Sequence, residues 1–415
     1  MQNSWLPSFQ PGFPDRLEIG ALESAQNPGT ADDKPFTDFA LVAPGTDLST
    51  LNLNWHERDL PEWQRTKHVH RLHPYLGKYI PQLVEIFLRK FSPKTVFDPF
   101  CGSGTTLVEA RALGIHAVGC DVSAFNCLLT KVKTDACNVA KLEREVRDIL
   151  GRLNTQLCDP LFAGSRGASG TDNAYLKQWF HPQALAQLLC FRSLVADYEH
   201  QDIFKIVLSR AARSARLTTH FDLDCPRKPA TEPYYCHKHH RTCQPTDESL
   251  NFLKRYALDT LERIREFAAI ARKSKVTVLH QDARTVELPK LDLVLTSPPY
   301  VGLLDYHEQH RYAYELLELP SREEQEIGAA FKGASKRAKQ AYCDEIRQVL
   351  VNLRPRLRKA GRVVIVVNDK YDLYTGIAEG SGFRIEQRLK RSVNRRTGRR
   401  AKEFFEEILI CQRHD

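Results

Sequence analysis

Within residues 95–121, TVFDPFCGSGTTLVEARALGIHAVGCD, the spacing of apolar positions changes from that of a strand to that of a helix and back. The apolar run at 95–100 predicts a short strand, and the glycines that follow predict a turn. Residues 105–113 have the apolar spacing of a helix, and the run at 116–121 predicts a second strand. Strand, turn, helix and strand in this order are the opening of a doubly wound parallel sheet.

A long helical stretch separates this unit from the remaining strands. Residues 132–275 carry apolar positions at helical spacing, as in LEREVRDILGRL and LNFLKRYALDTLERIREFAAIA. Strand patterns return in VTVLHQDA, LDLVLTSPPY and GRVVIVVND. The two last runs, FRIEQRLKRSV and KEFFEEILICQ, flank a basic turn and predict an antiparallel hairpin. The second half has no glycine turn of its own, which favours one interrupted sheet over two independent domains.

The predicted fold is therefore an α/β, Rossmann-like sheet with a terminal antiparallel hairpin and a largely helical insertion. Residues 1–54 are rich in Pro, Gly, Ser, Asp and Thr and predict an irregular N-terminal arm. Residues 55–131 and 276–415 are expected to form the sheet domain. Residues 132–275 are expected to form the insertion.

The glycine turn carries Asp98, Gly102 and Gly104 between the first predicted strand and its helix. Glycines let the backbone approach a ligand closely, and a helix N-terminus offers unpaired N–H groups. The next strand ends in Asp121, whose carboxylate can accept hydrogen bonds from both ribose hydroxyls. The phosphate-binding patterns GxGxxG, GKS and GKT are absent, and the Asp98 carboxylate would repel phosphate but attract a sulfonium. This pattern predicts a site for S-adenosylmethionine.

A second motif, LDLVLTSPPY, is an apolar strand that runs directly into Ser297, Pro298, Pro299 and Tyr300. The prolines donate no N–H to a sheet, so the strand must end there with carbonyls left free. Ligands bind at the carboxyl ends of strands in a doubly wound sheet. The Ser297 hydroxyl and the Pro298 carbonyl can accept hydrogen bonds from an amino group, and Tyr300 offers a surface on which a base can stack. The motif predicts a place where an exocyclic amine is oriented for methyl transfer.

Together FDPFCGSGTT and TSPPY resemble the motifs of the amino-methyltransferases of DNA restriction–modification systems, especially the cytosine-N4 type. The resemblance covers roughly residues 67–131 and 275–370. It implies an S-adenosylmethionine-dependent methyltransferase sheet in which the turn holds the methionine part of the cofactor. HPYLGKYIPQLVEIFLRKF resembles the helix that precedes the turn and closes the pocket. The cofactor-binding residues expected from the resemblance and the turn are Asp98, Phe100, Gly102, Ser103, Gly104, Thr105, Asp121 for the ribose and Asp282 near the adenine ring.

The resemblance also implies a substrate and partners. The expected activity is methylation of the N4 amino group of cytosine in double-stranded DNA, whose target base must be flipped out of the duplex. SPPY is typical of cytosine-N4 enzymes, whereas many adenine enzymes carry a carboxylate or an amide at the position of Ser297, and adenine-N6 methylation is the alternative. A cognate restriction endonuclease is the expected protein partner. The helical insertion is the candidate target-recognition region, because no other segment is large enough.

Two further functions share parts of this pattern. An RNA amino-methyltransferase would use the same chemistry on guanine amines, and a non-catalytic DNA-binding regulator could keep the fold. The glycine turn, Asp121 and SPPY argue against the regulator. Carbon-5 cytosine methylation is set aside, because it needs a thiolate, typically from a Pro-Cys pair that this chain lacks.

Composition agrees with a nucleic-acid partner. The 415 residues include 60 Lys and Arg against 51 acidic residues, a formal net charge of +9, which suits a polyanion. The basic turn in LKRSVNRRTGRRAK is a candidate for phosphate contacts. No run approaches the roughly 18 apolar residues that a membrane span needs, and the chain start lacks the pattern of a signal peptide. A cytoplasmic protein without a membrane partner is expected.

Eleven cysteines without a secretory signal favour free thiols or a metal site over disulfides. The stretch CPRKPATEPYYCHKHHRTC gathers cysteines and histidines. Cys225, Cys236, His239 (or His240) and Cys243 are candidate ligands of a tetrahedral zinc ion. Their spacing matches no standard finger, and a basic, aromatic loop that contacts DNA is the alternative.

Overall fold

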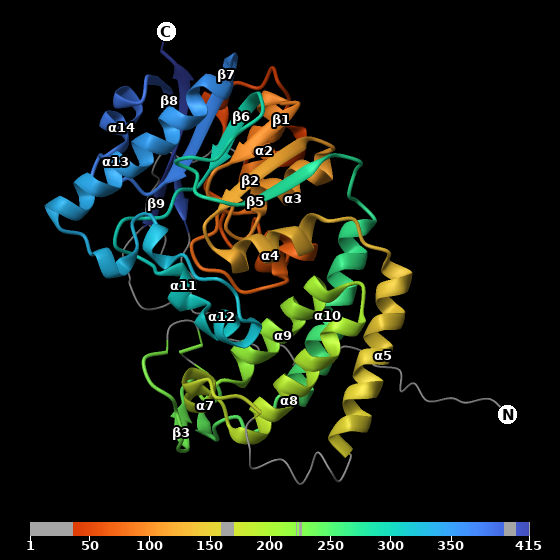
Figure 1. Cartoon of the computed structure of the whole chain (residues 1–415). Coiled ribbons are helices and arrows are strands. Elements are labelled where there is room, and N and C mark those ends of the chain that lie inside the picture. Colours follow the sequence, from red (N-terminus) through yellow and green to blue (C-terminus); the bar gives the residue numbers. More distant parts are fainter. Residues whose placement is uncertain (1–35, 159–169, 221, 224–225, 394–403, 415) are drawn as a thin grey trace, which may run out of the picture. The chain divides into compact units, whose positions relative to one another are not determined.

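A seven-stranded sheet forms the centre of the computed structural model, which describes residues 36–158, 170–220, 222–223, 226–393 and 404–414 (Figure 1). Its strands are β1 (Thr95–Asp98), β2 (His116–Asp121), β5 (Val276–His280), β6 (Leu291–Thr296), β7 (Leu357–Val367), β8 (Phe383–Val393) and β9 (Phe404–Arg413). They lie in the order β5-β2-β1-β6-β7-β9-β8. Strands β5, β2, β1, β6 and β7 run parallel to one another, and β9 is antiparallel to both β7 and β8. The predicted α/β sheet with a terminal antiparallel hairpin is confirmed.

Helices cover both faces of the sheet, because the buried strands are apolar on both sides. Side chains alternate along β1, so that Val96 contacts the helices of one face and Phe97 contacts those of the other. The helices on the Val96 side are α2 (Pro81–Phe91) and α3 (Thr105–Leu113), and those on the Phe97 side are α13 (Lys336–Leu353) and α14 (Tyr374–Gly380).

The unit that opens the sheet follows its sequence pattern closely. The helix α3 and the strand β2 have the predicted bounds, whereas β1 ends at Asp98, two residues earlier than expected. Pro99 follows it and cannot donate to a ladder. Gly104 precedes α3 with a φ of 80°, which a residue with a side chain rarely adopts.

The insertion is largely helical, as predicted. Its helices are α5 (Val139–Cys158), α7 (Ala174–Trp179), α8 (Pro182–Leu194), α9 (Gln201–Ala215) and α10 (Leu250–Ala268). They share one apolar cluster with α4 (Ala124–Thr134) and α12 (Arg311–Leu317) through residues such as Phe125, Leu129 and Tyr312. An antiparallel ribbon of β3 (Tyr234–Cys236) and β4 (Arg241–Cys243) was not predicted, because three-residue strands are too short to show a period of two.

The part of the N-terminal arm that the structure describes packs more closely than its composition predicted. Residues 36–54 contain no long element, yet Val42, Leu48 and Leu53 are buried in the cluster that also contains α2. Residues 1–35 and the basic turn at 394–403 lie outside the described residues. The remaining short elements are α1 (Glu62–Arg65), α11 (Tyr306–Gln309) and the 3₁₀ turns at Phe39–Leu41, Leu48–Thr50, His68–Arg71, Val195–Asp197, Glu323–Gln325, Ala330–Lys332 and Arg354–Arg356.

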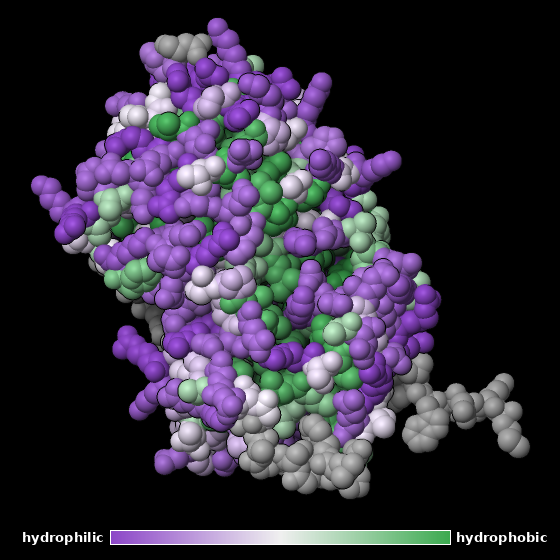
Figure 2. Space-filling view, in the orientation of Figure 1, coloured by the Kyte–Doolittle hydropathy of each residue, from purple (hydrophilic) through white to green (hydrophobic). Residues whose placement is uncertain are grey.

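The surface is mostly hydrophilic on the face drawn in Figure 2, where hydrophobic side chains gather along the middle. Over the described residues, none of the helices combines the length and the apolar composition needed to cross a membrane.

A buried cation joins two helices of the insertion and gives a test of their packing. Arg210 on α9 is almost fully buried, donates to Asp259 on α10 over 2.5 Å and lies 4.4 Å from the ring centre of Tyr256. Asp259→Ala should lower the free energy of unfolding by about 2 kcal/mol in denaturant titrations, because it leaves a buried guanidinium without its acid. Glu266→Ala removes an exposed partner of Arg263 on the same helix and should cost less than about 0.5 kcal/mol. Equal losses in the two variants would contradict this account.

Candidate functional site

Two turns meet at the carboxyl end of the sheet because β1 and β6 are neighbours, with Val96 opposite Leu293. The glycine turn follows β1, and the Ser-Pro-Pro-Tyr motif follows β6. A pocket of about 780 Å³, counting space open to solvent, lies at this edge. The predicted site residues that line it are Phe100, Gly102, Ser103, Thr105, Asp121, Asp282, Ser297 and Pro299.

Asp98 lies beneath the turn and does not line the pocket, although the sequence placed its carboxylate against the cofactor. Its Oδ1 accepts hydrogen bonds from the Phe100 N–H (3.1 Å) and the Thr296 hydroxyl (2.7 Å). Its Oδ2 accepts from the hydroxyls of Thr106 (2.7 Å) and Tyr79 (3.2 Å). Burial raises the pKa of Asp98, and these hydrogen bonds oppose the rise. The carboxylate thus ties the cofactor turn to the strand that carries the second motif.

The glycine turn forms a cradle that side chains would fill. Gly102 and Gly104 have φ values of 48° and 80°. A Cβ on Gly102 would lie 2.8 Å from the Tyr75 hydroxyl, and one on Gly104 would lie 2.8 Å from Thr130 on α4. The Thr130 hydroxyl also donates to the Gly102 carbonyl over 3.0 Å, so α4 supports the turn on the side where Gly104 lies.

Asp121 is the acid at the end of β2 and faces the pocket. Its Oδ1 accepts from the Ser123 N–H (2.8 Å), and its Oδ2 accepts from the Gly102 N–H (2.9 Å) and the Asn126 amide (3.2 Å). Burial raises the pKa of Asp121 to about 6, and the negative charge of Glu326 acts in the same direction. The hydrogen bonds fix the carboxylate and leave Oδ1, which accepts only the Ser123 N–H among the described residues, able to accept a further hydrogen bond from a ligand.

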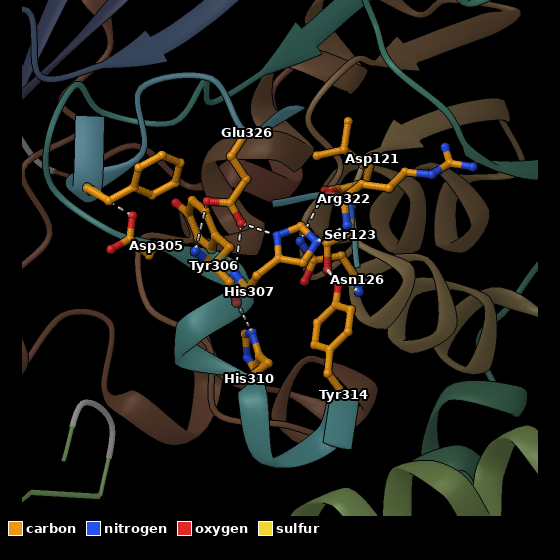
Figure 3. Close-up of polar contacts among 12 residues, drawn as sticks. Asp121, Ser123, Asn126, Asp305, Tyr306, His307, His310, Tyr314, Arg322 and Glu326 are labelled. Carbon is orange, nitrogen blue, oxygen red and sulfur yellow. Dashed lines mark hydrogen bonds and ion pairs between the residues drawn. The ribbon is translucent and has the colours of Figure 1, made fainter. Parts of the chain in front are cut away.

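A third wall of the pocket comes from the chain that follows the Ser-Pro-Pro-Tyr motif (Figure 3). Glu326 accepts from the backbone N–H groups of Tyr306 (3.2 Å) and His307 (2.8 Å), and it also bonds to His307 Nδ1. His307 Nε2 in turn accepts from the Arg322 N–H over 3.2 Å. Tyr306 stacks on Tyr75 at 5.7 Å between ring centres. This network holds the two loops of this wall, around His307 and Glu326, against each other.

Two tyrosines, one from α13 and one from α14, hold the Ser-Pro-Pro-Tyr motif in place. The Tyr342 hydroxyl donates to the Pro299 carbonyl over 2.9 Å and lies 2.6 Å from the Tyr374 hydroxyl. Ser297 lines the pocket, whereas Tyr300 packs on the neighbouring apolar cluster instead. Pro298 and Gly104 likewise do not line the pocket.

Asp282 lies beside Asp121, because β5 pairs with β2 and places His280 opposite Asp121. Its carboxylate is held by Arg284, whose Nε lies 2.9 Å from both oxygens. Arg284 also reaches Glu345 over 3.0 Å. This acid is therefore anchored in place at the edge of the pocket.

The lining of the pocket fits S-adenosylmethionine. Among the residues that the structure describes, three acids, Asp121, Asp282 and Glu326, line it with one cation, Lys78, and this balance favours a positively charged ligand over a phosphate. Asn126 belongs to this lining, and its Oδ1 is buried without a hydrogen-bond partner among the described residues, so its capacity as an acceptor is unused. The glycine cradle supplies the close approach that such a ligand needs.

Several pocket residues were not predicted individually. Tyr75, Lys78 and Tyr79 belong to the segment that the sequence resemblance placed over the pocket. Asn126 and Glu326 belong to no motif that was recognised. Their positions depend on α4 and on the loop after α12, which the sequence pattern alone does not bring to the pocket.

Three of the predicted metal ligands, Cys236, His239 and Cys243, lie together on the β3–β4 ribbon. The fourth member of the group is His220, and Cys225 lies outside the described residues. One ligand atom from each of the four side chains lies within 4.8 Å of the others. His220 was missed because it stands outside the Cys/His-rich stretch, 16 residues before Cys236.

Solved structures with some similarity include TrmN from Thermus thermophilus, at 11% identity and a TM-score of 0.32, covering 81% of this chain and 50% of that one. The rRNA methyltransferase aviRa from Streptomyces viridochromogenes matches at 12% identity and a TM-score of 0.33, covering 82% of this chain and 88% of that one. Such low scores say nothing about substrate.

Sequence relatives are more informative. Residues 46–131 match the N6/N4 methyltransferase family, described as DNA methylase. The chain is 24% identical to the type II methyltransferase M.MvaI of Kocuria varians, over 56% of this chain and 53% of that protein. It is 36% identical to the type II methyltransferase M.MjaII of Methanocaldococcus jannaschii, over 84% of this chain and 81% of that protein. The chain therefore belongs to the DNA methylase family that includes these type II methyltransferases.

Proposed function

We propose that this protein transfers a methyl group from S-adenosylmethionine to the N4 amino group of cytosine in double-stranded DNA, as the modification enzyme of a restriction–modification system. The observation that carries the proposal is that the glycine turn and the Ser-Pro-Pro-Tyr motif line one pocket. The 36% identity to a type II methyltransferase favours DNA over RNA as the substrate and an enzyme over a regulator. A cognate endonuclease is the protein partner that this role implies.

The cofactor would be held at both ends of the pocket. S-adenosylmethionine supplies a methyl group on a positively charged sulfur, which an amine can displace. The glycine cradle at Gly102 would receive the methionine part, and Asp121 would accept hydrogen bonds from the ribose hydroxyls. Asp282, anchored by Arg284, would lie beside the adenine ring.

The target amine would be oriented by the Ser-Pro-Pro-Tyr motif. Its nitrogen lone pair is delocalised into the ring, so hydrogen-bond acceptors that hold its hydrogens can direct the lone pair at the methyl carbon. Ser297 Oγ and the Pro298 carbonyl are the proposed acceptors. The Tyr342 hydroxyl fixes the next carbonyl, that of Pro299, and so restricts the motif to one geometry. Tyr300, which packs on the apolar cluster beside the pocket, is proposed to present its ring to the base when the base enters.

Cytosine is favoured over adenine by the residue at the start of the motif. Ser297 matches the form typical of cytosine-N4 enzymes, whereas many adenine enzymes have a carboxylate or an amide there. The hydroxyl can accept a hydrogen bond from either base, so adenine-N6 methylation is the second candidate.

A duplex substrate is supported by two exposed apolar side chains on the loops that also carry the pocket residues Tyr306 and Ile327. Leu303 and Phe331 are 53% and 61% exposed. Their loops are joined by the Gly302 N–H donating to the Gly328 carbonyl (2.8 Å) and the Phe331 N–H donating to Asp305 (3.1 Å). Apolar side chains held at such a place can enter the base stack when the target base leaves it. The helical insertion is the proposed target-recognition region.

Acid pH should weaken cofactor binding. With the pKa of Asp121 raised to about 6, the carboxylate is a full acceptor above that pH and becomes protonated as the pH falls through it. The Kd for S-adenosylmethionine, measured by calorimetry, should be constant from pH 7 to 8 and rise about tenfold per unit below pH 6. The Asp121→Asn variant should bind more weakly at pH 8 and show no such rise. Unchanged affinity of the wild-type protein at pH 5 would remove Asp121 from the site.

The product identifies the base. Digestion of methylated DNA to nucleosides and mass spectrometry should show N4-methylcytosine. Ser297→Ala should lower kcat by about 10- to 100-fold with little change in the Kd of S-adenosylmethionine, because it removes an acceptor for the target amine. Ser297→Asp restores an acceptor and should recover part of the rate. N6-methyladenine as the product would overturn the assignment of the base, and methyl label found in RNA alone would overturn the substrate class.

The apolar pair should matter for duplex DNA only. Replacing Leu303 and Phe331 together with Ala should slow methylation of plasmid DNA at least about tenfold, because unstacking the target base costs a few kcal/mol. Methylation of the same DNA after heat denaturation should be nearly unchanged. The control is Val351→Ala, which removes an exposed apolar side chain at a different place, on α13. Equal slowing on duplex and single strands would show that the pair has another role.

A further inference from the structure

We infer that His220, Cys236, His239 and Cys243 form a structural zinc(II) site that holds the β3–β4 ribbon to the insertion. The group lies outside the methyl-transfer pocket, because none of its members lines that pocket. It differs from the set that the sequence suggested by replacing Cys225 with His220. The inference does not depend on the proposed function.

The two cysteines lie on one face of the β3–β4 ribbon. Strands β3 and β4 pair with Cys236 opposite Arg241 and Tyr234 opposite Cys243, so both thiols lie on the same face. The two cysteines are only 3% and 7% exposed, whereas Tyr235 between them on the other face is 58% exposed. The turn between the strands is closed by the His239 N–H, which donates to the Cys236 carbonyl over 3.2 Å.

The distances match tetrahedral zinc. Zinc–sulfur bonds of about 2.3 Å and zinc–nitrogen bonds of about 2.0–2.1 Å at tetrahedral angles separate sulfur from nitrogen by about 3.6 Å. Cys236 Sγ lies 3.6 Å from His220 Nδ1, and Cys243 Sγ lies 3.5 Å from His239 Nδ1. The two imidazole rings are 4.5 Å apart between centres. A single ion can therefore contact all four side chains after small rotations.

The chemistry of the group also selects zinc. Two thiolates and two neutral imidazoles balance the charge of a divalent ion and form a common zinc ligand set. Four protein ligands leave no open position for water or substrate, so the site is structural and not catalytic. Tyr234 already fixes the His220 ring. The Tyr234 hydroxyl lies 2.9 Å from His220 Nδ1, and it accepts a hydrogen bond from the backbone N–H of His220 over 3.1 Å. When zinc binds, the lone pair of His220 Nδ1 would coordinate the ion and would no longer accept the hydrogen bond from the Tyr234 hydroxyl.

The ribbon needs such an ion for its stability. Two strands of three residues bury too little apolar surface to hold their own conformation in water. A zinc ion would link them to His220, which follows α9, the helix that packs against α10 and α12. Figure 1 shows β3 at the end of the insertion remote from the sheet. The ion would thus fix the exposed turn, with Lys238 and Arg241, to the helical core.

Metal content tests the site directly. Untagged full-length protein, purified without chelators and dialysed against zinc and then buffer, should contain about one zinc per chain by elemental analysis. His220→Asn and Cys236→Ser should lose it. The controls are His237→Asn, an exposed histidine in the same turn, and Cys225→Ser, and both should keep the ion. Cobalt(II) exchanged into the wild-type protein should give the visible absorption of tetrahedral coordination with thiolate ligands, which does not depend on the variants folding.

Two outcomes would overturn the inference. Wild-type protein that takes up no zinc and whose Cys236 and Cys243 are found joined as a disulfide after thiol trapping would exclude the site. Zinc lost in Cys225→Ser but retained in His220→Asn would exclude the ligand set that the structure indicates. Methylation activity plays no part in either measurement, so neither outcome bears on the proposed function.

Discussion

The architecture of the pocket depends on one buried carboxylate. Asp98 ends β1 and accepts the hydroxyl of Thr296, the last residue of β6, and the hydroxyl of Thr106 on α3. Burying a carboxylate without hydrogen-bond donors costs more free energy than an ordinary hydrogen bond contributes. The folded chain therefore keeps both hydroxyls close to the Asp98 carboxylate. Because Thr296 directly precedes the Ser-Pro-Pro-Tyr motif, the same contact fixes the second motif relative to the first. The pocket is the space above this junction.

Around that junction, backbone groups are held by side chains from elsewhere in the fold. Thr130 and Lys133 on α4 donate to the carbonyls of Gly102 and Ser103. Tyr342 on α13 donates to the carbonyl of Pro299. Each contact fixes a polar backbone group that a regular strand or helix would have paired by itself. The ligand-facing turns can therefore be irregular and still be well defined.

The sequence predicted those parts of the fold that local pattern determines. The bounds of α3 and β2, the antiparallel hairpin of β8 and β9 and the convergence of two motifs at one sheet edge all follow from periodicity and from the rules of parallel sheets. Glu326 and Asn126 were not predicted, since they reach the pocket from a loop and a helix whose positions depend on tertiary packing. The same reason explains why the sequence did not place His220 beside Cys236 and did not predict the hydroxyl donors around Asp98.

The insertion is joined to the pocket by a continuous apolar core. Its helices share one cluster with Leu129 of α4, the helix that holds the glycine turn, and with Tyr312 of α12, the helix that follows the Ser-Pro-Pro-Tyr motif. Packed interiors transmit small displacements because they contain few voids. The insertion is therefore fixed relative to both motifs by side-chain packing. An insertion on a flexible linker would not have this property, and here the shared cluster takes the place of a linker.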